Sequence, residues 1–219
     1  MQLHREDVVA GALELLDTEG LDGLTMRRLA DSLGVRAGAL YWHFESKQAL
    51  LDAMAEQLVK GVADDLAPEL PWDEQLAVIA RRYRMALLAR RDGARVVAGT
   101  FVAEPNTLHV GEVAVAILRG VGVPSERAGM LVFAVMYYVL GHTIEEQAQA
   151  DLADRGKWPS AAIAAIEDDG YQRALTSVAE VGPATRFEYG LATFLDGIRQ
   201  QVSVGRAALD RWSVPDGSS

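Results

Sequence analysis

The sequence predicts an all-α protein with a small N-terminal domain and a larger C-terminal one. Apolar residues recur three and four positions apart along most of the chain, whereas strand-type alternation is nearly absent. Glycine and proline separate the apolar stretches, most clearly at 68–71. A chain of 219 residues with 50% hydrophobic content can bury proper cores in one or two domains. We therefore expect a three-helix domain at 1–47, a connecting helix at 48–67, a helical domain at 68–205 and a loose tail at 206–219.

The sequence of the first domain predicts a helix over about residues 6–19, followed by a helix-turn-helix. Thr25 suits the N-cap of the next helix, whose apolar positions recur at helical spacing: Met26, Leu29, Ala30 and Leu33. Gly34 is placed to take the left-handed conformation that glycine adopts without cost, and Val35 should then be buried between two helices. This is the helix-turn-helix pattern, although two ordinary core helices joined by glycine would share it.

The segment after that turn predicts a short helix that is too narrowly apolar for a core helix. Its apolar residues, Leu40 and Phe44, form a single stripe. The side chains around this stripe can contact phosphates or bases: Arg36, Tyr41, Trp42, His43 and Lys47. A short anchored helix with an aromatic and basic outer face suits the major groove of DNA. The alternative is that Tyr41 and Trp42 pack beneath the domain.

The rest of the chain predicts a series of amphipathic helices. Ser46 suits the N-cap of a fourth helix that ends before Pro68, and Arg90 and Arg91 suit the negative C-terminal end of a long fifth one. Segment 154–170 is the least regular and the best candidate for a mobile flap, with a short helix near 161–166. The other expected elements are a helix over 72–91, a short helix or turn over 94–103, a helix opened by Pro105, and helices over about 126–150, 171–179 and 183–203.

The composition excludes several classes of protein. The chain has no cysteine, which excludes disulfides and thiolate metal sites and fits a cytoplasmic location. Its first residues lack the basic-then-apolar layout of a signal peptide. The uncharged run 128–144 is short for a membrane span and predicts a buried helix instead. Motifs for nucleophilic catalysis or phosphate cradling are missing.

The charge is unusual for a DNA-binding protein. The net charge is −10, and residues 1–47 carry five Lys/Arg against eight Asp/Glu. Phosphate contact needs only a local positive face, however, and the basic residues gather near the turn. This balance predicts weak binding to random DNA and a marked sensitivity to salt.

Two sets of motifs resemble a known family, the tetracycline-repressor (TetR) family. The first set resembles the DNA-binding domain of that family: GLTMRRLA at 23–30, LGV at 33–35, LYWHF at 40–44, Lys47 and Leu50-Leu51. The second set resembles the ligand domain of the tetracycline repressor subfamily: ALL at 86–88, RDGARV at 91–96, GT at 99–100, LG at 140–141 and IEEQ at 144–147.

The resemblance assigns roles to residues of the first domain. It implies that Arg27 reaches a guanine edge, that Thr25 contacts phosphate and that Lys47 anchors a phosphate. One departure matters: Ala37, Gly38 and Ala39 stand where the tetracycline repressor has glutamine, proline and threonine, so the operator should differ. The full set of expected DNA contacts is Thr25, Arg27, Arg28, Arg36, Ala37, Ala39, Tyr41, Trp42, His43 and Lys47.

The resemblance also implies a ligand site in the second domain. The tetracycline repressor binds its drug with magnesium through a histidine, with a threonine and a glutamate acting via water; the matching residues here are Val97, Thr100 and Glu145. Valine cannot ligate a metal, so we expect a more hydrophobic, metal-free ligand and no cofactor. His142 could assist, although a structural role for it is the alternative. The expected lining is Tyr83, Met85, Leu88, Val97, Thr100, Phe101, Ile117, Phe133, Met136, Tyr137 and Glu145.

The function implied by the resemblance is that of a transcriptional repressor. A homodimer, formed through the helices at 126–150 and 183–203, would bind a double-stranded DNA operator and be released by a small hydrophobic molecule. Two alternatives stay open. His142 and Glu145, three residues apart, could begin a carboxylate metal site of an all-α enzyme, but the chain lacks the second copy that a di-iron bundle needs. A member of the family could also act as an activator.

Overall fold

The computed structural model describes residues 3–100, 104–157 and 163–204. The described residues contain helices, turns and bends but no strand, which confirms the all-α prediction. The helices are α1 (Arg5–Gly23), α2 (Met26–Ser32), α3 (Ala37–Tyr41), α4 (Lys47–Leu58), α5 (Trp72–Leu88), α6 (Gly93–Ala98), α7 (Pro105–Gly120), α8 (Ser125–Asp154), α10 (Asp169–Glu180) and α11 (Pro183–Val204).

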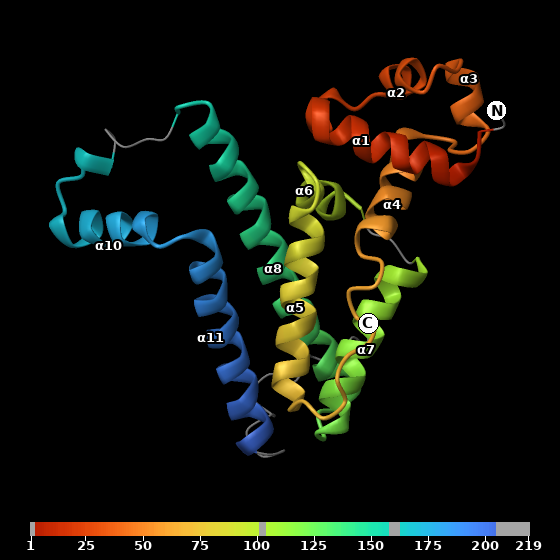
Figure 1. The fold of residues 1–219 in the computed structure, drawn as a ribbon. Coiled ribbons are helices and arrows are strands. Elements are labelled where there is room, and N and C mark those ends of the chain that lie inside the picture. The colour runs from red at the N-terminus through yellow and green to blue at the C-terminus, as the bar shows by residue number, and fades with distance from the viewer. Residues whose placement is uncertain (1–2, 101–103, 158–162, 205–219) are drawn as a thin grey trace, which may run out of the picture.

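Helices α1 to α4 form a head at one end of the molecule (Figure 1). Local signals built it as expected: the Thr25 hydroxyl accepts a hydrogen bond from the Arg28 amide, and the Ser46 hydroxyl accepts one from the Ala49 amide. Gly34 has φ +65° in the turn between α2 and α3. Its left-handed conformation explains why glycine occupies this position.

The remaining helices form a body below the head, in which α5 occupies a central place. Helix α5 packs against α6, α7, α8 and α11, and α8 packs against α5, α6, α7 and α11. The inner face of α5 is the expected apolar stripe, and all of its members are buried: Leu76, Ile79, Tyr83 and Leu87. Helix α6 lies across the head-side end of α5 and also packs against α4.

Two helices end earlier than expected. Helix α4 stops at Leu58 instead of continuing toward Pro68, because the chain then turns through left-handed residues at Gly61 and Asp65. Helix α5 stops at Leu88 rather than near 91, and Asp92 takes the left-handed conformation with φ +54°. Gly93 follows for a steric reason, since a Cβ there would lie 2.3 Å from the Leu87 carbonyl oxygen.

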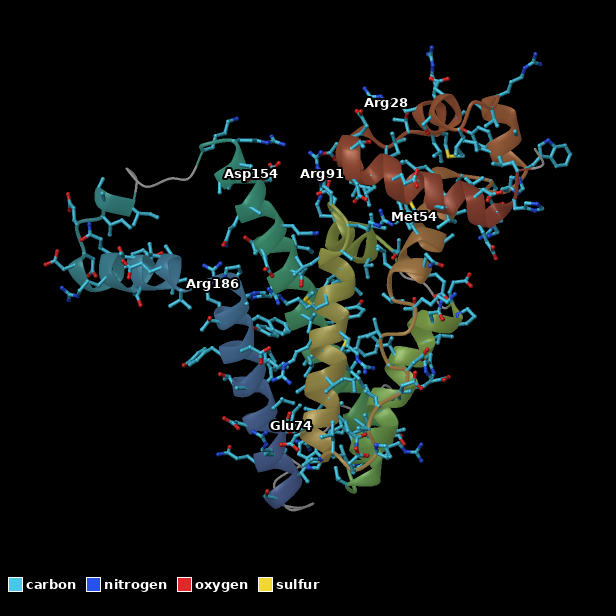
Figure 2. The ribbon with its side chains drawn as sticks, viewed as in Figure 1. Arg28, Met54, Glu74, Arg91, Asp154 and Arg186 are labelled. Atoms are coloured by element: carbon cyan, nitrogen blue, oxygen red, sulfur yellow. The ribbon has the colours of Figure 1, made fainter. Side chains whose placement is uncertain are left out.

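The role expected for Arg90 and Arg91 was therefore wrong. They do not cap the end of α5; the Arg90 guanidinium pairs with Asp17 of α1, and the Arg91 guanidinium donates to the Thr18 carbonyl oxygen. Figure 2 shows Arg91 where the far end of α1 meets the turn between α5 and α6. Tertiary contact with the head, rather than the helix dipole, fixes both arginines.

The C-terminal part of the body extends outward. Helix α8 is longer than expected, and α10 projects away from the body on the far side of α11 (Figure 1). None of the residues of α10 is buried. Of the short helix expected near 161–166, residues 163 and 164 are helical and 158–162 lie outside the described residues, as does the tail expected at 206–219.

Among the described helices, one is long and apolar enough to cross a membrane, and this helix is α8. Length and composition alone give that result, and core helices of soluble proteins meet the same test. Here α8 packs against four neighbouring helices of the body.

Candidate DNA interface and ligand site

The turn after α2 presents α3 outward from the head. Leu40 and Phe44 are fully buried and anchor this short helix on the core of the head. Tyr41 and Trp42 stand beside that anchor with 51% and 90% of their surface exposed. The alternative that both aromatic residues pack beneath the domain is therefore wrong, and they remain available for a partner.

The basic residues of the head fall into two groups. Among the described residues, Arg27, Arg36 and Lys47 make no ion pair and no side-chain hydrogen bond, and the two arginines are exposed. Arg28, the neighbour of Arg27, instead donates to Glu19 at 2.9 Å and to the Gly23 carbonyl oxygen at 3.4 Å. Figure 2 shows Arg28 on α2 above the end of α1. From the sequence, both adjacent arginines were expected to contact DNA. In the described part of the structure, only Arg27 of the two has a free guanidinium.

The outer face of α3 itself is smooth. Ala37 and Gly38 are exposed and Ala39 is half-buried, and a Cβ added at Gly38 would meet no atom within 4 Å. Arg36 occupies the N-cap position but makes no capping hydrogen bond with its side chain. The guanidinium of Arg36 therefore stands at the start of a helix whose next three residues offer only methyl groups or hydrogen.

Arg5 is a residue of the head that sequence reasoning missed. Its guanidinium donates to the His43 carbonyl oxygen at 2.9 Å and lies 4.1 Å above the centre of the Phe44 ring. It thereby fixes the connection between α3 and α4, where half-buried His43 and Lys47 lie. The two partners are 38 residues apart in sequence, so no local spacing could have revealed the contact.

The residues expected to line a ligand site have different surroundings in a single chain. Tyr83 and Val97 are buried, and the Thr100 hydroxyl donates to the Val97 carbonyl oxygen at 2.9 Å. Leu88, Thr100, Ile117 and Met136 are half-buried, while Phe101 lies outside the described residues. Four others are exposed: Met85, Phe133, Tyr137 and Glu145.

Exposed apolar residues gather on the outer surfaces of α8 and α11. The tilted rings of Phe133 and Tyr137 have centres 5.7 Å apart, and Met130 lies one turn earlier on the same face of α8. On α11, Tyr189 is 79% exposed, and Phe194, whose ring centre lies 5.1 Å from that of Tyr138, is 37% exposed. We call these five residues the outer apolar face. Such a surface on helices that already pack together is what a symmetric helical bundle needs from a partner.

A buried ionic cluster, also missed from the sequence, joins α5, α8 and α11. Arg84 and Glu146 form a two-pronged pair with distances of 2.6 and 2.9 Å, and their side chains are only 12% and 13% exposed. The His142 ring lies beside the stacked rings of Tyr138 and Phe187, 5.8 and 5.4 Å from their centres, and its Nε2 lies 3.1 Å from the Pro183 carbonyl oxygen. Burial lowers the pKa of His142, although the Pro183 contact and the Glu146 charge act in the opposite direction. These contacts favour the structural role for His142.

Polar contacts connect the head to the body at two places. At the first, the Asp92 carboxylate accepts from the Leu21 amide at 2.8 Å and Arg95 pairs with Asp22. On α8, Gln147 binds the same corner through the carbonyl oxygens of Leu87 and Arg90 and the Ala94 amide. The corner between α5 and α6 is therefore bonded both to α1 and to α8.

The second connection runs along α4. Gln48 donates to the Gly99 carbonyl oxygen at 3.3 Å, at the end of α6. The Glu56 carboxylate accepts from the amides of Asn106 and Thr107, at 2.7 and 3.1 Å, and so caps the start of α7. The end of α6 and the start of α7 are thus both bonded to α4.

A metal site is not visible in the described part of the chain, where no group of three or more His, Asp or Glu side chains comes together. The pair of His142 and Glu145 suggested by spacing does not meet: His142 is directed at Glu146, 3.9 Å away, and Glu145 is exposed.

This arrangement defines a class of protein. A helix-turn-helix that exposes an aromatic and basic face, bonded through its fourth helix to a larger helical domain, is the architecture of a DNA-binding regulator. Comparison with known proteins narrows the class to one family. Residues 8–54 match the model of the bacterial regulatory proteins of the tetR family, and residues 67–202 match the tetracyclin repressor-like C-terminal domain. The chain belongs to the TetR family of transcriptional regulators.

Individual relatives are similar over most of their length. The chain is 39% identical over 202 residues to the tetracycline repressor protein class C of Escherichia coli, covering 91% of this chain and 92% of that protein. A possible TetR family regulator from Streptomyces coelicolor A3(2) superposes with a TM-score of 0.80 at 42% identity, covering 90% of this chain and 99% of the other.

Two further solved structures contain partners. A TetR variant from Acinetobacter baumannii AYE in complex with minocycline superposes with a TM-score of 0.70 at 36% identity, covering 91% and 98% of the two chains. A BioQ protein with its natural double-stranded DNA operator superposes with a TM-score of 0.63 at 39% identity, covering 71% and 94%.

Proposed function

We propose that this chain is a homodimeric repressor that leaves its operator when a small, hydrophobic, metal-free molecule binds in the body. The observation that carries the proposal is the outward face of the head, where exposed Tyr41 and Trp42 lie on a helix-turn-helix whose Arg27, Arg36 and Lys47 make no ion pair among the described residues. Unpaired cations and exposed aromatic rings suit a polyanionic partner. The similar BioQ protein is solved with operator DNA, which supports the same surface here.

The operator contacts divide into two kinds. Thr25, Tyr41, His43 and Lys47 would contact the phosphate backbone and set the register of the head, together with Trp42 at the edge of the groove. Arg27 and Arg36 would read base edges, because a guanidinium can meet both acceptors of guanine. Ala37 and Ala39 offer only methyl groups, which suit a thymine methyl. Arg28 contributes less, since Glu19 already occupies it.

The division of labour follows three proposed domains: the DNA-binding domain at 1–47, the connecting helix at 48–67 and the ligand and dimer domain at 68–205. Two heads must stand about 34–36 Å apart to bind a two-fold operator. A ligand that favours a different spacing would shift the population away from the DNA-bound form. The contacts of Gln48 and Glu56 with the segment around α6 and α7 give that shift a route to α4.

The second copy of the chain would cover the outer apolar face. Two pairs of α8 and α11 would then form a four-helix bundle. Phe133 and Tyr137, which are exposed in one chain, would be buried there and could reach the ligand site from the dimer side.

The inducer should differ from tetracycline with magnesium, although a related structure holds minocycline. Buried Val97 stands at the position where the resemblance places the metal-binding histidine, and a valine offers no lone pair. Three further half-buried candidates are apolar: Leu88, Ile117 and Met136. The matches to regulator families over most of the chain support a regulator rather than an enzyme, which would act in the cytoplasm beside its DNA.

The test is a footprint on the DNA that flanks the chain's own gene, with and without a panel of hydrophobic antibiotics. We expect protection of a two-fold site that disappears with one member of the panel and returns when that compound is removed. EDTA should leave the release unchanged. A chain that protects no flanking DNA would contradict the proposal, and release that requires magnesium would contradict the metal-free part. Enhanced transcription from the bound site would identify an activator.

A further inference from the structure

Tyr83 is a phenol in an otherwise aliphatic row. It lies on the inner face of α5 between Ile79 and Leu87, and only 9% of its surface is exposed. It belongs to the buried core of the chain, as do Val97 of α6 and Val139 of α8. The side chains one turn before and after it on α5, Ile79 and Leu87, are aliphatic and offer a hydroxyl no partner.

The hydroxyl of Tyr83 has no hydrogen-bond partner among the described residues. Tyr138 shows the usual solution for a covered tyrosine, because its hydroxyl donates to the Phe187 carbonyl oxygen at 2.8 Å. Every side-chain nitrogen or oxygen that is sealed from solvent in the described part of the chain has a partner. The unpartnered oxygen of Tyr83 is therefore not sealed, and it faces space that a water molecule or a ligand atom can reach.

The protonation state of this group is also defined. Burial raises the pKa of Tyr83 to about 12, so the phenol is neutral at physiological pH. A neutral phenol can donate one hydrogen bond to an oxygen. Such a bond favours ligands that can accept it over ligands that cannot, by about the strength of one hydrogen bond.

We propose that the Tyr83 hydroxyl is the specificity contact of the ligand site and selects hydrophobic molecules that present a neutral oxygen acceptor, such as a ketone or ether, to α5. This rests on the proposed function, since it assigns a chemistry to the inducer of that site. The inducer is then an apolar molecule with at least one oxygen directed at the centre of α5, rather than a pure hydrocarbon or a metal chelate.

The first experiment measures binding of two matched fluorescent probes to the full-length protein. One is 6-propionyl-2-dimethylaminonaphthalene, whose ketone can accept from Tyr83; the other is its 6-propyl analogue, in which a methylene replaces the carbonyl. The ratio of the two Kd values should shift toward the propyl probe by about three- to tenfold in Tyr83→Phe, as loss of one hydrogen bond predicts. The emission of the ketone probe should also move to shorter wavelength, because its carbonyl loses a donor.

The second experiment measures thermal stability without any probe. Tyr83→Phe removes a hydroxyl that has no protein partner, so its Tm should equal or exceed that of the wild type. Tyr138→Phe is the matched control; it breaks the bond to the Phe187 carbonyl oxygen and should lower the Tm while leaving the Kd ratio unchanged.

Three results would overturn the proposal: a Kd ratio that is the same in wild type and Tyr83→Phe, a Tm that falls in Tyr83→Phe as it does in Tyr138→Phe, or a wild-type protein that binds neither probe. None of these measurements uses DNA. A failure of the repressor function would appear in the footprint instead, so the two proposals can fail separately.

Discussion

The head and the body both expose large apolar side chains, but for different partners. In the head, Tyr41 and Trp42 are exposed, and Arg27 and Arg36 make no ion pair with any described residue. In the body, the outer apolar face of α8 and α11 carries Phe133 and Tyr137, whose rings lie 5.7 Å apart. Aromatic surface beside free positive charge suits DNA, whereas exposed apolar side chains on paired helices suit a second copy of the same helices. The comparison shows that the neighbouring charges, not the exposure itself, indicate the kind of partner.

The largest effect should come from a substitution that disrupts the outer apolar face of the body. Phe133→Asp places a charge in the centre of the outer apolar face and should give a monomer in analytical ultracentrifugation. Operator affinity should then fall about 10²- to 10⁴-fold, because two linked heads bind far more tightly than one. Leu108→Asp on α7 is the control: it puts the same charge on an exposed leucine away from that face and should leave a dimer. A dimeric Phe133→Asp protein would move the interface elsewhere.

The next largest effect concerns the head and compares the contributions of two adjacent arginines to operator binding. Arg27→Ala should weaken operator binding by about 1–3 kcal/mol, roughly 5- to 150-fold, since a guanidinium that reads a base is lost. Arg28→Ala removes a side chain already paired with Glu19 at an exposed site and should cost about 1 kcal/mol or less. Fluorescence anisotropy at one fixed salt concentration measures both. Equal losses for the two variants would show that the Glu19 pair opens on DNA.

A smaller effect tests whether the head binds phosphate as its charges indicate. Lys47→Ala should weaken all duplexes by a similar factor and reduce the slope of log K against log salt by about one. The same titration on Glu69→Ala, an exposed charge in the loop beyond α4, should leave the slope unchanged. An unchanged slope for Lys47→Ala would remove this residue from the interface.

The smallest effect concerns the packing of α11 on α8. The pKa of His142 is lowered below its ordinary value of 6.5 in the folded chain, so the unfolded chain binds more protons as the pH falls through that value. Stability is therefore present above pH 6.5 and declines as the pH falls toward the lower folded pKa. The Tm should fall slightly between pH 7.5 and pH 5.5, a window above the titration of ordinary carboxylates. His142→Gln should flatten this dependence, and a Tm that rises on acidification would reverse the sign.

Local signals predicted the head well because short-range physics decides it. Thr25 and Ser46 as N-caps and Gly34 with positive φ depend on residues within one turn of the chain, and the structure has each of them as expected. The anchoring of α3 by Leu40 and Phe44 follows from helical spacing alone. Predictions at this scale needed no knowledge of what lies across the molecule.

Predictions that depended on distant neighbours fared less well. Arg90 and Arg91 looked like the end of α5 and instead bind α1, and the pair of Arg84 with Glu146, 62 residues apart, left no trace in the sequence pattern. Apolar spacing also made Tyr83 and Phe133 equivalent, although one is buried and the other is exposed in a single chain.

The sequence by itself determined where the helices begin, which residues form the turn of the head and which family the motifs resemble, because caps, periodicity and left-handed glycines act over a few residues. Only the tertiary structure decided, for the residues that it describes, which of two adjacent arginines is free, which tyrosine has a partner for its hydroxyl and which apolar side chains stay exposed. Those properties depend on contacts between side chains that lie far apart in sequence, and such contacts are set by how helices pack rather than by the order of residues within any one of them.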